Sequence, residues 1–226
     1  MSNAPKGSKK PVRRPGRAIT LDEVIKLMSV CGRGAAGLRN QAFIALGFGA
    51  GLRCAEILAV KPAHIERTAE GPLVLVLSGK GNKSRRVSLL PEFLAPIERW
   101  LERRTKLGIT NRSPIICGIT ESSMANTLGG TRGTKGKPVS TALMRATLAR
   151  LAKKAGIEGR VHCHGLRHGL ATAMNANRTG LQEITQQLGH SSTAITDRYL
   201  AKVSPDKLLA AAAAFPRFLH GRTGPH

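Results

Sequence analysis

Six polar side chains occur at points where a purely structural sequence would gain little from them. They carry guanidinium, ammonium, imidazole and phenol groups: Arg53, Lys80, His164, Arg167, His190 and Tyr199. Arginine and lysine bind anions, imidazoles move protons, and a phenol hydroxyl can act as a nucleophile once it is activated. Taken one at a time, each residue has an ordinary explanation as a surface or packing residue. Only their joint order along the chain favours a shared chemical role.

The six residues lie in short sequence boxes that follow one another along the chain. The boxes are GLRCAEI at 51–57, GKGNK at 79–83, HGLRH at 164–168, LGHSS at 188–192 and TDRY at 196–199. In this order they resemble the successive boxes of the tyrosine recombinase (phage integrase) family. The resemblance runs from Thr20 to the last predicted helix, and chance agreement over five separated boxes is negligible.

The resemblance implies a site-specific DNA recombinase that cleaves and rejoins strands without metal or ATP. Tyr199 is expected to attack the scissile phosphate and form a 3′-phosphotyrosyl link, which keeps the energy of the broken bond. Arg53 and Arg167 are expected to bind the nonbridging phosphate oxygens, because each guanidinium offers paired donors. The family supplies these roles, and the chemistry of a phosphodiester is consistent with them.

The resemblance also implies which residues move protons. Lys80, a compact donor at a predicted hairpin tip, would protonate the leaving 5′ oxygen, and His164 would handle the tyrosine proton. His190 would hydrogen-bond the phosphate. Glu56, three residues after Arg53 on the same predicted helix, is expected to orient or support rather than to react, and His168 to support the site or pack the helix.

His162 and His164 form a His-x-His pair that admits another interpretation, as metal ligands of a nuclease. Two-metal nucleases need clustered carboxylates, and the chain has only 13 Asp and Glu residues. We therefore expect no metal and no other cofactor, and interpret His162 as a structural residue or a phosphate neighbour. Four cysteines lack any CxxC spacing and are expected to be reduced core thiols: Cys31, Cys54, Cys117 and Cys163.

The charge of the chain predicts a polyanionic partner. The chain carries 36 Lys and Arg against 13 Asp and Glu, a formal net charge of +23, which is more than solubility requires. Aromatic residues are only 3% of the chain, so base stacking on single strands is disfavoured and double-stranded DNA is the expected partner. Eight basic residues are expected to contact the DNA backbone: Lys83, Arg85, Arg86, Arg132, Lys135, Lys137, Arg145 and Arg150.

The sequence carries no sign of a membrane protein. No apolar run approaches the roughly 18 residues of a spanning helix. The N-terminus also lacks the apolar region of a signal peptide. We therefore expect a cytoplasmic protein that associates with DNA and not with a membrane.

Apolar periodicity predicts a mainly α domain with one small antiparallel β-sheet (α+β), the fold class that a tyrosine recombinase (DNA breaking-rejoining) catalytic domain also implies. Thr20 to Glu23 has the pattern of a capping box that opens a first helix, and Ser140 is a good N-cap. A β-hairpin with a basic tip is predicted from 73–77 and 85–89, and a long loop from 118–137. Further helices are predicted over about 39–48, 53–58, 92–105, 141–155, 166–177, 182–188, 193–200 and 204–214.

The predicted organisation has three parts. Residues 1–18 form a flexible basic arm or linker, 19–203 the catalytic domain, and 204–226 a C-terminal helix and tail. Family members commonly carry a separate DNA-binding domain before the catalytic one, so the chain is either a fragment or one of the short members. In the family the last helix commonly docks on the neighbouring protomer of a DNA-bound homotetramer, and packing on its own domain is the equally weighted alternative.

Two other functions fit the same fold. A DNA-binding regulator would keep the fold without cutting, but it has no need of Tyr199 or Lys80. A type IB topoisomerase shares the tyrosine chemistry and relaxes DNA without a specific site. Integration, excision, inversion and resolution use the same active site, so the sequence does not separate them.

Overall fold

The computed structural model describes residues 17–77, 84–119 and 135–189. This part of the chain is mainly helical with one three-stranded antiparallel sheet, as predicted. Short 3-10 helices occupy Pro62–His64 and Pro91–Phe93. The helices and strands in chain order are α1 Leu21–Ser29, α2 Ala35–Gly49, α3 Cys54–Ala59, β1 Ile65–Thr68, β2 Gly71–Leu77, β3 Ser84–Ser88, α4 Leu94–Lys106, α5 Thr141–Lys154, α6 Cys163–Ala176 and α7 Leu181–Leu188.

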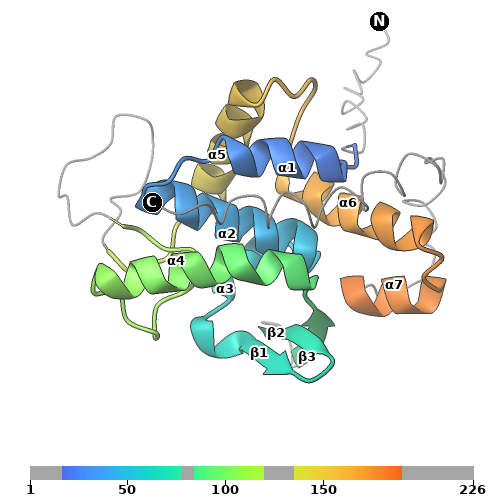
Figure 1. Ribbon diagram of the computed structural model, residues 1–226, viewed down its shortest axis with the longest axis horizontal. Coiled ribbons are helices and arrows are strands. Elements are labelled where there is room, and N and C mark those ends of the chain that lie inside the picture. The colour runs from blue at the N-terminus through green and yellow to red at the C-terminus, as the bar shows by residue number, and fades with distance from the viewer. Residues whose placement is uncertain (1–16, 78–83, 120–134, 190–226) are drawn as a thin grey trace, which may run out of the picture.

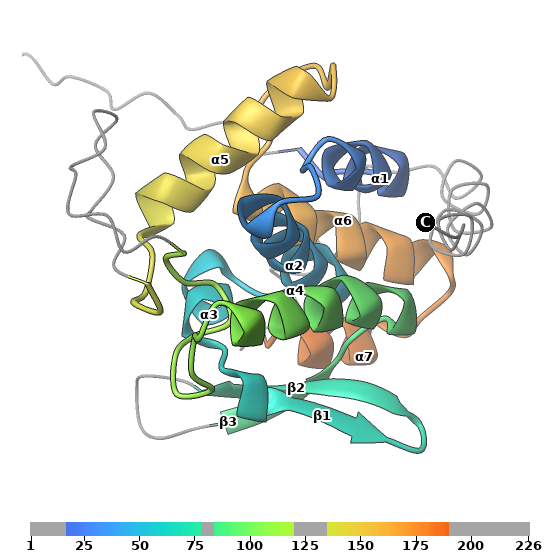
Figure 2. The same cartoon turned by 60° about the vertical axis from the view of Figure 1, so that its left-hand side comes forward.

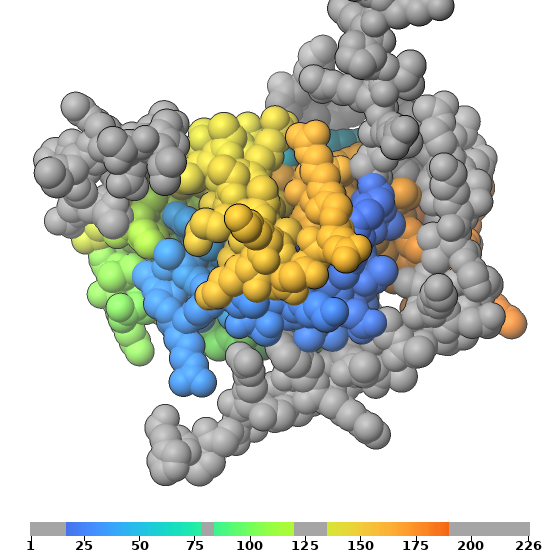
Figure 3. All heavy atoms as spheres, turned by 90° about the horizontal axis from the view of Figure 1, so that it is seen from above, coloured from blue at the N-terminus to red at the C-terminus, as the bar shows by residue number. Residues whose placement is uncertain are grey.

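Helix α2 is the centre of the fold. It packs against α1, α4 and α6, which surround it in both ribbon views (Figures 1 and 2). Its residues from Ala42 to Leu46 are fully buried, because the second half of the helix, from Ala42 to Gly49, is apolar on every side instead of along one stripe. Seen from above, α5 and the segment that leads to α6 lie beside α1 (Figure 3), where Lys154 Nζ donates a 3.1 Å hydrogen bond to the carbonyl of Val30.

The sheet lies below α3 and α4 in Figure 2 and has the strand order β1-β2-β3. Val74 of β2 stands opposite Ile65 of β1 and Val87 of β3, and all three side chains are buried. Alternate residues of β2 therefore face the core, as the period of a strand requires. The predicted hairpin is confirmed for β2 and β3, whose connection at 78–83 lies outside the described residues.

Most predicted helix boundaries agree with the structure. Thr20 forms the predicted capping box with Glu23, and Ser140 accepts a hydrogen bond from the Leu143 N–H as the N-cap of α5. Helices α2 and α6 begin four and three residues earlier than predicted, at Ala35 and Cys163. The helices predicted over 193–200 and 204–214 lie outside the described residues. Among the described residues, no helix is long and apolar enough to cross a membrane.

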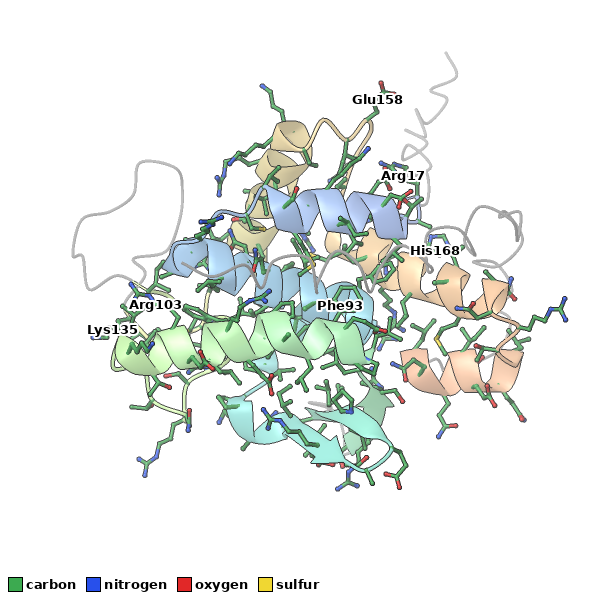
Figure 4. The ribbon with its side chains drawn as sticks, viewed as in Figure 1. Arg17, Phe93, Arg103, Lys135, Glu158 and His168 are labelled. Atoms are coloured by element: carbon green, nitrogen blue, oxygen red, sulfur yellow. The ribbon has the colours of Figure 1, made fainter. Side chains whose placement is uncertain are left out.

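The folded structure already includes Arg17, which the sequence places in the flexible arm. Its guanidinium donates to both carboxylate oxygens of Glu23 at 2.7 and 2.8 Å and to the carbonyl of Glu158 at 2.7 Å (Figure 4). The backbone of Ile19, two residues after Arg17, lies very close to α6: a Cβ added to Gly169 would lie 2.1 Å from the carbonyl oxygen of Ile19. A glycine at that position of α6 therefore allows the start of the folded chain to lie against the helix.

Candidate active site

Arg167 is a buried arginine whose guanidinium donates hydrogen bonds to two main-chain carbonyls. It lies on α6 with 2% of its surface exposed. One guanidinium nitrogen donates to the carbonyl of Gly51 at 2.7 Å, and the other donates to the carbonyl of Leu188 at the end of α7. Gly51 has a φ of +66°, and a Cβ there would lie 2.8 Å from Leu170 Cδ2. The tight turn before α3 thus requires glycine and presents its carbonyl to Arg167.

Arg53 is the N-cap of α3 and directs an exposed guanidinium away from the core. Its backbone N–H and Nη1 donate to the two carboxylate oxygens of Glu56 at 2.8 and 2.9 Å. Nη2 lies 3.4 Å from the carbonyl oxygen of Gly189. Arg53 and Arg167 therefore reach adjacent carbonyls at the end of α7, although they come from boxes far apart in the sequence.

Glu56 receives a second arginine from the sheet. Arg85 of β3 donates through Nη2 to both oxygens of Glu56 at 3.1 Å. Burial alone would raise the pKa of Glu56, but the hydrogen bond from the Arg53 N–H and the charges of Arg85 and Arg53 outweigh it, so the pKa lies below its usual value. Glu56 is therefore an ionised carboxylate that binds the Arg53 side chain and backbone. Arg85, predicted to contact DNA, turns inward to the same carboxylate.

Helix α7 is attached to the rest of the protein largely through hydrogen bonds to main-chain atoms. Its buried residues Ile184 and Leu188 form a small cluster with Ala171, separate from the main core. Gln187 accepts from the Ser88 N–H at 3.0 Å and donates to the carbonyls of Ser88 at 2.7 Å and Ala50 at 3.2 Å. This one side chain joins α7 both to β3 and to the turn that precedes Arg53.

We expect Gln187→Leu to loosen α7. The replacement keeps the size of the side chain but removes three hydrogen bonds, each worth about 1 kcal/mol net. The free energy of opening of the α7 amides in native-state hydrogen exchange should fall by about 2–3 kcal/mol. Gln186→Leu, an exposed neighbour on the same helix, is the matched control and should leave α7 protection unchanged. Equal protection in the two variants would contradict the attachment described above.

Three histidines lie along the start of α6. His162 is the N-cap, and its Nδ1 accepts a 3.1 Å hydrogen bond from the Gly165 N–H. The exposed His164 ring stacks at 6.5 Å on the His162 ring. Loss of hydration, followed by the charge of Arg167, lowers the pKa of His164, so its imidazole is neutral at pH 7 and able to accept a proton. His168 follows one turn later on the same side of α6 (Figure 4).

A cleft of about 850 Å³ joins several of these groups. Arg53, His162 and His164 line it together with Arg145 of α5. Among the described residues, no group of three His, Cys, Asp or Glu side chains is placed to hold a metal ion. The donors that line the cleft are mainly cationic or neutral, which suits an anionic group such as a phosphate.

The other predicted basic residues are spread over the surface. Arg86 forms a 2.8 Å ion pair with Glu66 on β1. Lys135 lies with Arg103 at the C-terminal end of α4, far from His168 (Figure 4). Lys137 and Arg150 are exposed elsewhere. Five predicted site residues lie outside the described part of the chain: Lys80, Lys83, Arg132, His190 and Tyr199.

Sequence reasoning missed two contributors to this arrangement. Gln187 has no signal in the sequence, because its partners are main-chain atoms of residues far away in the chain. The inward orientation of Arg85 has a weak signal: it lies two residues before the buried Val87, and residues two apart in a strand face the same side of the sheet.

Comparisons with known proteins identify relatives of this chain. The phage integrase family model matches residues 17–204. Tyrosine recombinase XerC of Bradyrhizobium diazoefficiens is 31% identical over 179 residues, which cover 79% of this chain and 50% of that protein. XerC of Yersinia pestis is 27% identical over 226 residues, covering 98% of this chain and 68% of that protein. The chain thus spans about half to two thirds of the length of these relatives.

Solved structures share the fold. XerA recombinase matches with a TM-score of 0.68 and 24% identity, over 96% of this chain and 68% of that one. XerH recombinase bound to its difH substrate in a pre-cleavage complex matches with a TM-score of 0.65 and 22% identity, over 88% of this chain and 53% of that one. The match of the family model to most of the sequence establishes that the chain belongs to the phage integrase family.

Proposed function

We propose that this chain is the catalytic part of a site-specific DNA recombinase that cuts and rejoins strands through Tyr199. The observation that carries the proposal is the meeting of Arg53 and Arg167 at the end of α7. Their partners are the carbonyls of Gly189 and Leu188, directly before His190 in the chain. The Arg53 guanidinium and the neutral His164 imidazole line one cleft, and Arg167 lies behind Arg53 at the same end of α7. Such a set of groups suits the charge of a phosphodiester in an in-line displacement.

The proposed reaction proceeds by two phosphoryl transfers. The Tyr199 oxygen attacks the scissile phosphorus, a 3′-phosphotyrosyl bond forms, and the bond to the 5′ oxygen breaks. His164 accepts the tyrosine proton, Lys80 donates a proton to the leaving 5′ oxygen, and Arg53 and Arg167 offset the charge on the nonbridging oxygens. A 5′-hydroxyl of a second strand then reverses the step. Because the phosphotyrosyl link retains the energy of the bond, neither ATP nor a metal is needed.

The proposed substrate is double-stranded DNA, and the proposed location is the cytoplasm, in association with that DNA. The net charge of +23 supports a polyanionic partner. Related structures are described as bound to their DNA substrates, among them XerH and the lambda integrase dimer on a COC′ core site.

We propose that strand exchange uses a homotetramer on paired sites, with residues 19–203 as the catalytic domain, 204–226 docking on a neighbour and the arm before Arg17 following the DNA backbone. Lys83, Arg86, Arg132, Lys135, Lys137, Arg145 and Arg150 are the proposed backbone contacts.

A covalent adduct assay tests this function. The full chain and its Tyr199→Phe variant are incubated in EDTA with supercoiled plasmid that carries the DNA flanking the gene, and the reaction is stopped with SDS. We expect a protein–DNA adduct and topoisomers with the unmodified chain only, and only on plasmid with the flanking DNA. Tight DNA binding without an adduct would overturn the proposal in favour of a non-cleaving regulator. Relaxation of any plasmid would favour a topoisomerase.

A further inference from the structure

Arg85 turns toward the protein interior, although the sequence predicts a DNA contact for it. Its side chain on β3 is 25% exposed, compared with 64% for its neighbour Arg86. Arg85 Nη2 donates to both carboxylate oxygens of Glu56 at 3.1 Å, whereas Arg86 pairs with Glu66 on β1. The two arginines therefore leave β3 on opposite faces of the sheet, as adjacent residues of a strand do.

The end of α7 covers part of the Arg85 guanidinium. Gly189 has a φ of +61°, and a Cβ added there would lie 2.6 Å from Arg85 Nε and 2.7 Å from Arg85 Cζ. Glycine therefore leaves the room that the guanidinium occupies. A guanidinium that packs against Gly189 and binds Glu56 has little surface left for a phosphate of DNA.

The hydrogen bonding of Arg85 itself does not account for its inward orientation. Arg85 Nε is buried and has no hydrogen-bond partner among the described residues, whereas a guanidinium that pointed outward would have all of its donors hydrated. A buried donor without a partner is unfavourable. The contact with Glu56 is therefore the feature that the inward orientation provides.

Glu56 connects Arg85 to Arg53. The Glu56 side chain is 14% exposed and the Arg53 side chain 46%. A long, exposed side chain has many rotamers, and one ion pair with a residue of the same helix restricts them only weakly. Arg85 belongs to β3, so it fixes the Glu56 carboxylate to the sheet as well as to α3. Arg53 thus binds a carboxylate that is held from a second element.

We propose that Arg85 is a positioning residue, which holds the Arg53 guanidinium in the site by fixing the Glu56 carboxylate from β3. The proposal rests on the proposed function, because Arg53 is the group assigned there to the scissile phosphate. Arg85 itself touches neither the DNA nor the reacting atoms. Its replacement should therefore slow strand cleavage without weakening the binding of DNA.

Rates of adduct formation separate cleavage from binding. The full chain and its Arg85→Gln variant are compared on DNA that carries the flanking sequence, over a range of protein and salt concentrations. We expect Arg85→Gln to lower the rate at saturating protein on the order of 10²-fold, the cost of displacing a reacting group by about 1 Å. The half-saturating protein concentration should stay unchanged. Arg85→Lys, which keeps the charge on a less rigid side chain, should recover part of the rate.

Two other arginines of the sheet are the controls. Arg67 of β1 forms an exposed ion pair with Glu98 of α4, so Arg67→Gln should change neither the rate nor the affinity. Arg86 is a proposed backbone contact, so Arg86→Gln should weaken binding and reduce the slope of log affinity against log salt by about 1. The same loss of slope in Arg85→Gln would overturn the proposal and make Arg85 a DNA contact.

A double-mutant cycle tests whether Arg85 acts through Glu56. Glu56→Gln keeps the size of the side chain and removes its charge, so it should slow adduct formation about as much as Arg85→Gln. The variant with both substitutions should then lie within about twofold of either one. Effects that multiply would overturn the connection. A lower denaturant midpoint of Arg85→Gln with an unchanged rate per folded molecule would make Arg85 a merely structural residue.

NMR without DNA separates this test from the proposed function. In protein with isotope-labelled arginine, the heteronuclear NOE of the Arg53 Nε–H group reports the mobility of that side chain. Loss of the signal in Arg53→Lys assigns it. We expect the NOE to fall in Arg85→Gln and to stay unchanged in Arg67→Gln. An unchanged NOE in Arg85→Gln would overturn the positioning role whether or not the chain cleaves DNA, whereas absence of any adduct with the unmodified chain would overturn the proposed function.

Discussion

Arg167→Ala is expected both to slow DNA cleavage strongly and to destabilise the fold. The substitution removes the donors to two main-chain carbonyls, those of Gly51 and Leu188. Because Arg167 is only 2% exposed, water cannot readily replace these donors. Leaving each buried carbonyl unpaired costs roughly 1–3 kcal/mol, so the free energy of unfolding should fall by about 2–5 kcal/mol. Loss of one group that stabilises transition-state charge costs about 10²–10³-fold in rate.

Arg53→Ala is the control that separates the two effects. The Arg53 side chain is 46% exposed, and Glu56 keeps its second partner Arg85 when Arg53 is shortened. An exposed ion pair contributes about 1 kcal/mol or less, so the denaturant midpoint should hardly move while adduct formation falls as far as in Arg167→Ala. Denaturant unfolding and the adduct assay on both variants measure this. Equal destabilisation by the two substitutions would contradict the separate roles assigned to the two arginines.

Arg104→Leu is expected to destabilise the protein strongly without reaching the site. Arg104 is fully buried at the end of α4. It donates to the carbonyls of Pro114 at 2.9 Å, Thr110 at 2.8 Å and Ser113 at 3.1 Å, and so holds the segment that follows the helix. Leucine would leave three carbonyls without this donor, and the free energy of unfolding should fall by about 3–5 kcal/mol.

Arg103→Leu is the matched control for Arg104→Leu. Arg103 precedes Arg104 on the same helix, is exposed, and makes the same change in charge and volume when it is replaced. Its effect on the free energy of unfolding should lie within about 0.5 kcal/mol. Urea unfolding followed by the fluorescence of Trp100, the single tryptophan, compares the variants. A similar midpoint for both would show that the buried arginine contributes no more than a surface charge.

The elements that could be predicted from the sequence are those with local signals. Thr20 and Ser140 mark the starts of α1 and α5 because N-caps act on amides two or three residues away. The early start of α2 was missed because residues 34–38 contain two glycines and no polar cap. Strand β1 was missed because Ile65–Thr68 is four residues long with one buried side chain, so no alternation is visible. Pairing with β2 defines this strand, and pairing is not local.

The candidate site divides in the same way. Arg53, His164 and Arg167 could be predicted because their boxes resemble a family whose sites are built from them. The burial of Arg104 could not be predicted, because its acceptors are main-chain carbonyls of the segment after α4 and no residue next to it in the sequence indicates them. That Cys54 and Cys163 line one cleft was also missed, since only the fold brings the starts of α3 and α6 to the same cleft.

The attachment of α7 has a consequence for how far such a sequence can diverge. Arg53, Arg167 and Gln187 all end on main-chain carbonyls, at Ala50, Gly51, Ser88, Leu188 and Gly189. A carbonyl is supplied by every residue type, so mutational drift at Ala50 or Ser88 leaves the acceptor in place as long as the backbone path persists. Selection on the attachment of α7 therefore acts on the donor side chains Arg53, Arg167 and Gln187 and on Gly51. A homologue can exchange most of its other side chains and still attach α7 in the same way.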